Sequence, residues 1–170
     1  MGEATDLLLE IQRHSAWANR QILAAAERMP VEQLRTPIGE GGYGDLLETL
    51  LHMYDAQMTW LERATTGTNG PVLGIAEVSS IAALRGLWDE LDVHMEVYIN
   101  GLSDAMLREV VSYRSYYGSE GRYSHRDMFL HQAFHAHQHR GEVALVLSQL
   151  GYSPGEIDVI DYLVSERDGE

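Results

Sequence analysis

Residues 131–142, HQAFHAHQHRGE, contain three histidines at intervals of four: His131, His135 and His139. On an α-helix, residues four apart lie one turn above each other on the same face, so two neutral imidazoles at this spacing can bind one divalent metal ion. Both His131 with His135 and His135 with His139 are suitable pairs, and spacing does not choose between them. A single helical histidine more often serves packing or hydrogen bonding, whereas three in register favour a metal site.

Such a site needs a further ligand from elsewhere in the chain. The candidates are His14, His52 and His94, each inside another segment of helical periodicity. His52 has polar or small helical neighbours, which either line a cleft or face water: Glu48, Thr49, Asp55, Ala56 and Thr59. His125 and His137 lie off the histidine stripe, so we expect them at the surface or behind the ligands. Three protein ligands with open positions are typical of a catalytic metal site, while structural zinc sites usually contain cysteine.

The donor types limit the chemistry. Imidazole ligands suit zinc, nickel, iron or copper, and the Irving–Williams order of affinities does not identify the native ion. Zinc and nickel are the ions that we expect. A metal with open positions lowers the pKa of a bound thiol or water. Because the chain has no cysteine, any thiol must come from solution, and disulfides are excluded. Asp55 and Glu142 are the candidate acids or bases; for Asp55 the alternative is a solvated helix position.

The overall charge excludes some classes of partner. The chain has 12 basic and 26 acidic side chains, a formal charge of -14, whereas nucleic acids and anionic membranes bind clustered Lys and Arg. No apolar run approaches the ~20 residues of a membrane helix. The first residues also lack the basic start and apolar segment of a signal peptide. The sequence therefore predicts a cytoplasmic protein whose partner is a small molecule, and neither nucleic acid nor membrane.

Four segments with apolar residues at helical spacing must position these side chains. They span about residues 5–28, 45–64, 80–99 and 124–150. Asp45 with Glu48, and Ser124 with Asp127, suit helix N-termini. Gly67 and Gly151 suit the helix ends.

The connections between these helices are long. Residues 107–123 are rich in Val and Tyr and contain a Gly-Ser-Glu-Gly turn, which indicates a short hairpin. The glycine-rich segment 39–44, GEGGYG, lacks the Lys-Ser/Thr and the preceding strand of a phosphate-binding loop. Residues 156–166 suggest one more short helix. The fold class is therefore all-α: one domain over residues 1–170, a four-helix bundle with long connections and a short β-hairpin-like excursion before the last long helix.

Three motifs resemble the DinB-like (DinB/YfiT-like) superfamily of metal-binding four-helix bundles over essentially the whole chain. They are Trp17-Ala18-Asn19, LLETLLHMYDAQMTWLER at 46–63, and His131…His135…His139-Arg140-Gly141 leading to LSQLG at 147–151, of which the last is the most specific. The resemblance implies metal ligation by His52, His135 and His139, with His131 as an alternate or outer-shell residue. Glu142 departs from the Gln that is usual in the family at this position. We expect its carboxylate to hydrogen-bond a ligand or to alter the charge of the site.

The resemblance also implies a function. Relatives include transferases and isomerases that use low-molecular-weight thiols such as bacillithiol or mycothiol, so the expectation is a divalent-metal-dependent, S-transferase or isomerase type of enzyme acting as a homodimer. One alternative is a metal-dependent hydrolase with Glu142 or Asp55 as general base. Another is a non-catalytic, stress-related dimer that binds a metal or small molecule. A fourth protein ligand would leave no coordination position for a substrate and would favour this non-catalytic alternative.

Residues beside the motifs have structural interpretations. We expect Arg140 to be an ion-pair partner and Gly141 to permit close approach of another segment. Trp17 should pack, and Asn19 should hydrogen-bond from helix to loop. Hairpin packing is the default role of four tyrosines, which could instead overhang the site or form a dimer patch: Tyr113, Tyr116, Tyr117 and Tyr123.

Overall fold

A computed structural model describes residues 2–40 and 42–168. Four long helices form a bundle: α1 (Glu3–Ala26), α2 (Leu46–Thr66), α3 (Ile81–Asn100) and α4 (His125–Gln149). Short elements connect or follow them: the 3₁₀ turns η1 (Val31–Arg35), η2 (Ile75–Glu77) and η3 (Met106–Arg108), the strands β1 (Val110–Arg114) and β2 (Glu120–Ser124), and α5 (Val159–Asp168). The predicted all-α bundle with a hairpin before its last long helix is confirmed. Within the described ranges, no helix combines the length and apolarity needed to cross a membrane.

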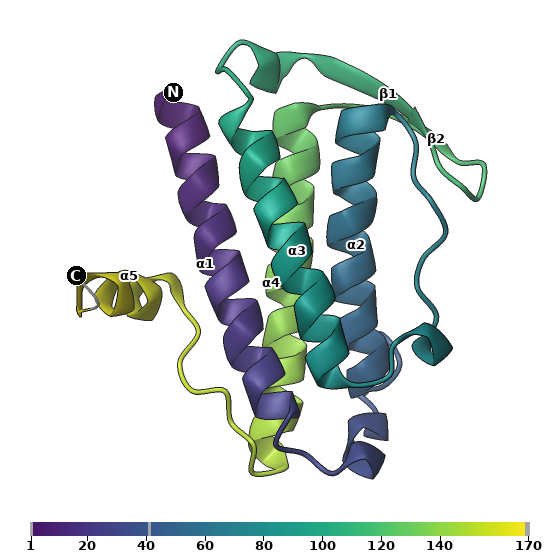
Figure 1. The fold of residues 1–170 in the computed structure, drawn as a ribbon, viewed down its shortest axis with the longest axis vertical. Coiled ribbons are helices and arrows are strands. Elements are labelled where there is room, and N and C mark those ends of the chain that lie inside the picture. The colour runs from purple at the N-terminus through teal and green to yellow at the C-terminus, as the bar shows by residue number, and fades with distance from the viewer. Residues whose placement is uncertain (1, 41, 169–170) are drawn as a thin grey trace.

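The order of the helices brings α2 and α4 face to face. In Figure 1, α1 and α4 run in one direction and α2 and α3 run in the other, so the connection from α2 to α3 descends along the outside of the bundle. Helix α4 packs against both α1 and α2, while α3 packs mainly against α1. The histidine-bearing face of α4 therefore has α2 as its neighbour.

The start of α2 is fixed by local hydrogen bonds. The Glu48 amide donates to Asp45 Oδ1 at 2.9 Å, and the Asp45 amide donates to Glu48 Oε2 at 3.0 Å, a reciprocal capping box. Gly67 ends the helix with φ +73°, a conformation in which glycine has no Cβ penalty. At the start of α4, Ser124 Oγ accepts from the Asp127 amide at 3.1 Å. Both predicted helix starts are thus confirmed by their caps.

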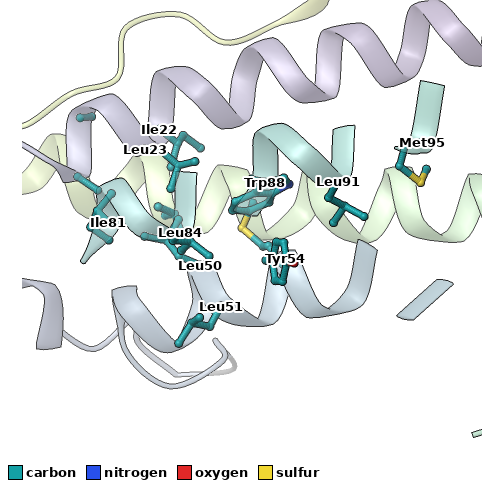
Figure 2. Packing of buried hydrophobic residues seen from close by; sticks show 14 of the residues in the cluster. Ile22, Leu23, Leu50, Leu51, Tyr54, Ile81, Leu84, Trp88, Leu91 and Met95 are labelled. Carbon is teal, nitrogen blue, oxygen red and sulfur yellow. The ribbon is translucent and has the colours of Figure 1, made fainter. Parts of the chain in front are cut away.

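The core between the helices combines apolar packing with a buried polar layer. Trp88 and Tyr54 lie edge to face, with ring centroids 6.0 Å apart, and both belong to the apolar cluster shown in Figure 2. Trp88 Nε1 donates to Gln57 Oε1 at 3.0 Å. Gln57 and Gln12 in turn donate to Asp92 Oδ1 at 3.0 and 2.9 Å. Burial raises the pKa of Asp92 to about 6 despite these hydrogen bonds.

The hairpin is present as predicted, and its turn overlaps the predicted turn in part. Strands β1 and β2 are antiparallel, and Tyr113 faces Gly121. The turn lies at residues 115–119, where the Ser115 amide donates to the Ser119 carbonyl at 2.7 Å. It includes the first two residues of the predicted Gly-Ser-Glu-Gly (118–121), and the last two begin β2. Gly121 belongs to β2, and a Cβ there would lie 2.6 Å from the Tyr113 ring. Gly121 thus permits a close approach inside the ladder.

The close approach predicted for Gly141 is wrong. Gly141 lies inside α4 and is exposed, and a Cβ built there meets no atom within 4 Å in the described part of the chain. The sequence could not show this, because free space around a helical position depends on which segments pack there.

Gly141→Ala should therefore stabilise the protein by about 0.5–1 kcal/mol, because alanine restricts the unfolded chain and favours the helix without a clash. Urea unfolding of the metal-free protein, followed by far-UV circular dichroism, measures this change. Gly121→Ala is the matched control and should destabilise, since its Cβ meets the Tyr113 ring. Destabilisation by Gly141→Ala would show that the space around Gly141 is needed.

Candidate metal centre

Three histidines from two helices converge on one point. His52 comes from α2, and His135 and His139 come from α4; one ring nitrogen of each lies within 4.8 Å of those of the other two. His52 Nε2 and His135 Nε2 are 3.1 Å apart. The ring centroid of His139 lies 5.0 Å from that of His52 and 4.6 Å from that of His135. The structure therefore brings together the three residues that the resemblance implied.

The geometry of the cluster fits a divalent metal ion. Two imidazole nitrogens on one tetrahedral zinc ion would lie about 3.3 Å apart, given Zn–N distances of about 2.0–2.1 Å. The observed 3.1 Å between His52 Nε2 and His135 Nε2 is close to this separation. Burial lowers the pKa of His52, and burial with the neighbouring histidines lowers that of His135 to about 4. Both rings are consequently neutral at pH 7, the state in which imidazole ligates a metal.

Glu142 orients one of the three rings. His139 Nδ1 donates to Glu142 Oε2 at 2.7 Å, and Gln138 Nε2 donates to Glu142 Oε1 at 3.2 Å. Partial burial alone would raise the pKa of Glu142, but these hydrogen bonds outweigh it and the pKa is lowered. The carboxylate thus holds the proton of His139 on Nδ1 and leaves Nε2 free, as carboxylates that accept from metal-bound histidines do. The hydrogen bond expected from Glu142 is present.

His135 is oriented by packing instead. Its Nδ1 is buried and has no hydrogen-bond partner among the described residues, and its ring lies among those of His52, His131 and His139. Among the described residues, the one hydrogen-bond contact of the ring is therefore that of Nε2 with His52 Nε2, at the point of convergence.

Comparison with known proteins gives a family and a fold for the chain. The sequence model of the DinB family matches residues 1–170. The chain belongs to the DinB family. Among the solved structures, this DinB-family chain is similar to YfiT from Bacillus subtilis, described as "a probable metal-dependent hydrolase with an unusual four-helix bundle topology". The likeness covers 90% of this chain and 91% of YfiT with 16% identity and a TM-score of 0.67, and it shows the shared fold. No protein of curated function matches.

The other histidines of this DinB-family protein lie outside the cluster. His14 Nε2 lies 3.0 Å from the Ile157 carbonyl oxygen, and His125 Nδ1 lies 2.5 Å from the Tyr98 hydroxyl. His94 and His137 are exposed. His131 is also exposed. Its ring lies between Trp60, at 4.8 Å, and His135, at 5.8 Å between centroids, next to the three converging histidines but not among them.

Three polar neighbours of His52 on α2 are buried, namely Thr49, Asp55 and Thr59, whereas Glu48 is partly exposed. Asp55 is 5% exposed and accepts a hydrogen bond from the Leu73 amide at 3.0 Å. Burial raises its pKa to about 6, although this hydrogen bond acts in the opposite direction. A solvated role for Asp55 is therefore wrong, because the side chain anchors the connection between α2 and α3. Thr49 is fully buried and donates to the Tyr43 carbonyl at 2.6 Å.

Two aromatic residues next to the cluster had no role assigned from the sequence. The Tyr43 ring stacks on His52, with centroids 3.8 Å apart and planes 13° apart. Trp60 packs edge-on against His131 and also against Tyr113 and Tyr123. These contacts confirm hairpin packing for those two tyrosines. The available signal for Tyr43 was a single aromatic residue in the glycine-rich segment 39–44.

The Arg140 side chain supports the bundle without the predicted ion pair. Arg140 is 2% exposed; Nη1 donates to Asn19 Oδ1 at 3.2 Å and Nη2 to Ser15 Oγ at 3.4 Å. No carboxylate of the described residues lies within salt-bridge distance, so that prediction is wrong. Asn19 joins two helices, where a helix-to-loop bond was predicted. Trp17 packs against His14 and Tyr162, as expected.

Proposed function

We propose that this DinB-family protein is a divalent-metal-dependent enzyme, with His52, His135 and His139 as ligands, that activates a low-molecular-weight thiol against an electrophilic small molecule. The observation that carries the proposal is the convergence of the three ring nitrogens within 4.8 Å. Zinc or nickel is the ion that we propose. When bound, such an ion lowers the pKa of a coordinated thiol or water toward neutrality. Three protein ligands leave coordination positions open, which supports an enzyme over a purely structural or storage site.

The occupied carboxylates favour a thiol over water as the nucleophile. Both candidate bases have partners: Glu142 accepts from His139, and Asp55 accepts from the Leu73 amide. A thiol, with an ordinary pKa of about 8.5, needs far less help to ionise near neutral pH than water, with a pKa of about 15.7. In the proposed reaction the thiol gives its proton to solvent, and its sulfur forms a bond to the electrophilic atom, which releases its leaving group. The thiol comes from solution, and bacillithiol and mycothiol are examples of the class.

Hydrolysis is the second candidate, supported by the description of YfiT as "a probable metal-dependent hydrolase". It would use an ion-activated water and, in its usual form, a carboxylate general base. Glu142 is the carboxylate that contacts the cluster. The two candidates therefore differ in what they require of this side chain.

Glu142→Gln should leave zinc affinity and thiol-transfer activity within about tenfold of wild type, because the amide oxygen still accepts the Nδ1 proton of His139. Glu142→Ala removes the acceptor and should weaken zinc binding about 10- to 100-fold, the range for residues that hydrogen-bond a metal ligand. Zinc titration and kcat/KM measure both effects. Complete loss of activity in Glu142→Gln with normal zinc content would instead identify Glu142 as a general base and favour hydrolysis.

The direct test uses the purified protein loaded with zinc or nickel, assayed with bacillithiol, mycothiol and other cellular thiols against a panel of alkylating and aromatic electrophiles. Thiol-dependent turnover that a chelator abolishes and added metal restores is the expected result. Chelator-sensitive turnover of esters or amides without a thiol would favour hydrolysis. Absence of turnover in the metal-loaded protein would contradict an enzymatic role. Light scattering of the same preparation tests our further proposal, from the family resemblance, that the protein is a homodimer.

A further inference from the structure

The glycine-rich segment between η1 and α2 places an aromatic ring on one of the candidate metal ligands. The Tyr43 ring lies almost parallel to that of His52, at 3.8 Å between centroids. Tyr43 is 51% exposed, so burial of its own surface gives only part of the energy needed to hold it there. Its place on His52 must also depend on the backbone that carries it.

That backbone is fixed at several points. The Ile38 amide donates to the Gly44 carbonyl and the Leu46 amide to the Thr36 carbonyl, both at 3.0 Å. The Tyr43 carbonyl accepts a hydrogen bond from Thr49 Oγ1 at 2.6 Å. Thr49 lies in α2, three residues before His52. Gly44 has φ +65°, a conformation that side chains other than glycine rarely adopt. These hydrogen bonds attach the backbone around Tyr43 to α2, the helix that contains His52.

His52 lacks the support that the other two histidines have. Glu142 holds the His139 ring through Nδ1, and His135 is enclosed by three histidine rings. The only hydrogen bond of the His52 ring in the described chain is between its Nε2 and His135 Nε2, and a metal ion would take over both of these nitrogens. The His52 ring also meets those of His135 and His139 edge-on, but both are candidate ligands themselves. Among the described residues, the stacked Tyr43 ring is therefore the aromatic contact from outside the three ligands that can fix the rotation of the imidazole.

We propose that Tyr43 is a positioning residue of the metal centre, which holds the His52 imidazole in its ligating orientation by stacking. The backbone of residues 36–40 and 42–46 holds Tyr43 in place, and the hydrogen bond from Thr49 attaches it to α2. The inference rests on the proposed metal site. It assigns to His52 of α2 a supporting contact from Tyr43, as Glu142 supports His139 of α4. The glycine-rich sequence lacks the features of a phosphate-binding loop, and the inference gives it a role in metal binding instead.

The test is zinc affinity, measured by competition with a chromophoric chelator for wild type, Tyr43→Ala and Tyr43→Phe. Tyr43→Ala should bind zinc about tenfold more weakly, as when other outer-shell partners of metal ligands are removed. Tyr43→Phe keeps the stacked ring and should stay within about twofold of wild type. Cobalt absorption spectra provide a second readout: bands should shift in Tyr43→Ala and be unchanged in Tyr43→Phe.

Tyr117→Ala is the matched control, because Tyr117 is 69% exposed in the turn of the hairpin and its recorded ring contact is with Tyr116. Thr49→Val removes the hydrogen bond to the Tyr43 carbonyl and should weaken zinc binding with both rings intact. Equal affinity of wild type, Tyr117→Ala and Tyr43→Ala would overturn the inference and leave the metal site standing. Equal losses in Tyr43→Phe and Tyr43→Ala would also overturn it, since the hydroxyl would then matter more than stacking. Failure of wild type to bind either zinc or nickel would overturn the proposed function itself.

Discussion

His135→Ala should lose zinc binding by more than 100-fold, beyond the range of about 10- to 100-fold for residues that only support a ligand. Its ring contributes the nitrogen that lies 3.1 Å from His52 Nε2 and packs against His139. Removal leaves two donors, one from each helix, and opens the centre to water. Metal content after dialysis and zinc titration measure the loss. His52→Ala and His139→Ala should behave in the same way.

Thermal unfolding gives an independent readout of this prediction. Zinc at 100 times its dissociation constant should stabilise the wild type by about 2.7 kcal/mol, equivalent to a rise in Tm of roughly 5–10 °C for a domain of this size. His135→Ala should show no such rise. Without metal the variant should be little less stable than wild type, because His135 Nδ1 is buried without a partner and its removal relieves that cost.

His131→Ala is the control from the same helix face. His131 contacts Trp60 and His135 but does not join the three converging nitrogens. We expect this variant to keep its zinc and its metal-dependent rise in Tm. Full zinc content in His135→Ala would contradict the ligand assignment. Loss of zinc in His131→Ala would place the site one helical turn nearer the start of α4.

The ligands on α4 could be anticipated because their relation is local. A spacing of four places His135 and His139 on one helix face whatever the rest of the chain does. The partner from α2 is different, because periodicity left His14, His52 and His94 open. The choice of His52 came from the family resemblance, since only the packing of α2 against α4 brings these residues together.

The surroundings of the ligands were less predictable because they depend on side-chain packing and loop conformation. Tyr43 reaches His52 through the bond between Thr49 and its own carbonyl, which no spacing rule describes. Asp55 has the helical position of a solvated residue, but the connection from α2 to α3 covers it. Gly141 and Arg140 are neighbours in sequence with opposite environments, one exposed and one buried. A sequence pattern gives the face of a helix more readily than what packs against that face.

Arg140→Ala should destabilise the metal-free protein by about 3 kcal/mol. The guanidinium bonds Asn19 and Ser15 across the interface of α1 and α4. Burial lowers the pKa of Arg140 to about 10, against the opposing effect of the Asp92 carboxylate, so the side chain is charged at pH 7. Its removal leaves Asn19 Oδ1 without its donor, beside an Nδ2 that already has no partner among the described residues. Urea unfolding at pH 7 measures the change.

Arg140→Met separates the structural role from any role in the metal centre. Methionine fills the volume of the arginine stem and removes the cost of burying a charge, so this variant should lose only about half as much stability as the alanine variant. Its zinc affinity should stay within about threefold of wild type, because Arg140 bonds α1 and makes no hydrogen bond to the three histidines. An Arg140→Met variant with normal stability and weakened zinc binding would contradict the structural role and indicate one in the metal centre. The Arg-Gly pair after His139 would then act on the metal, and its link to α1 would be secondary.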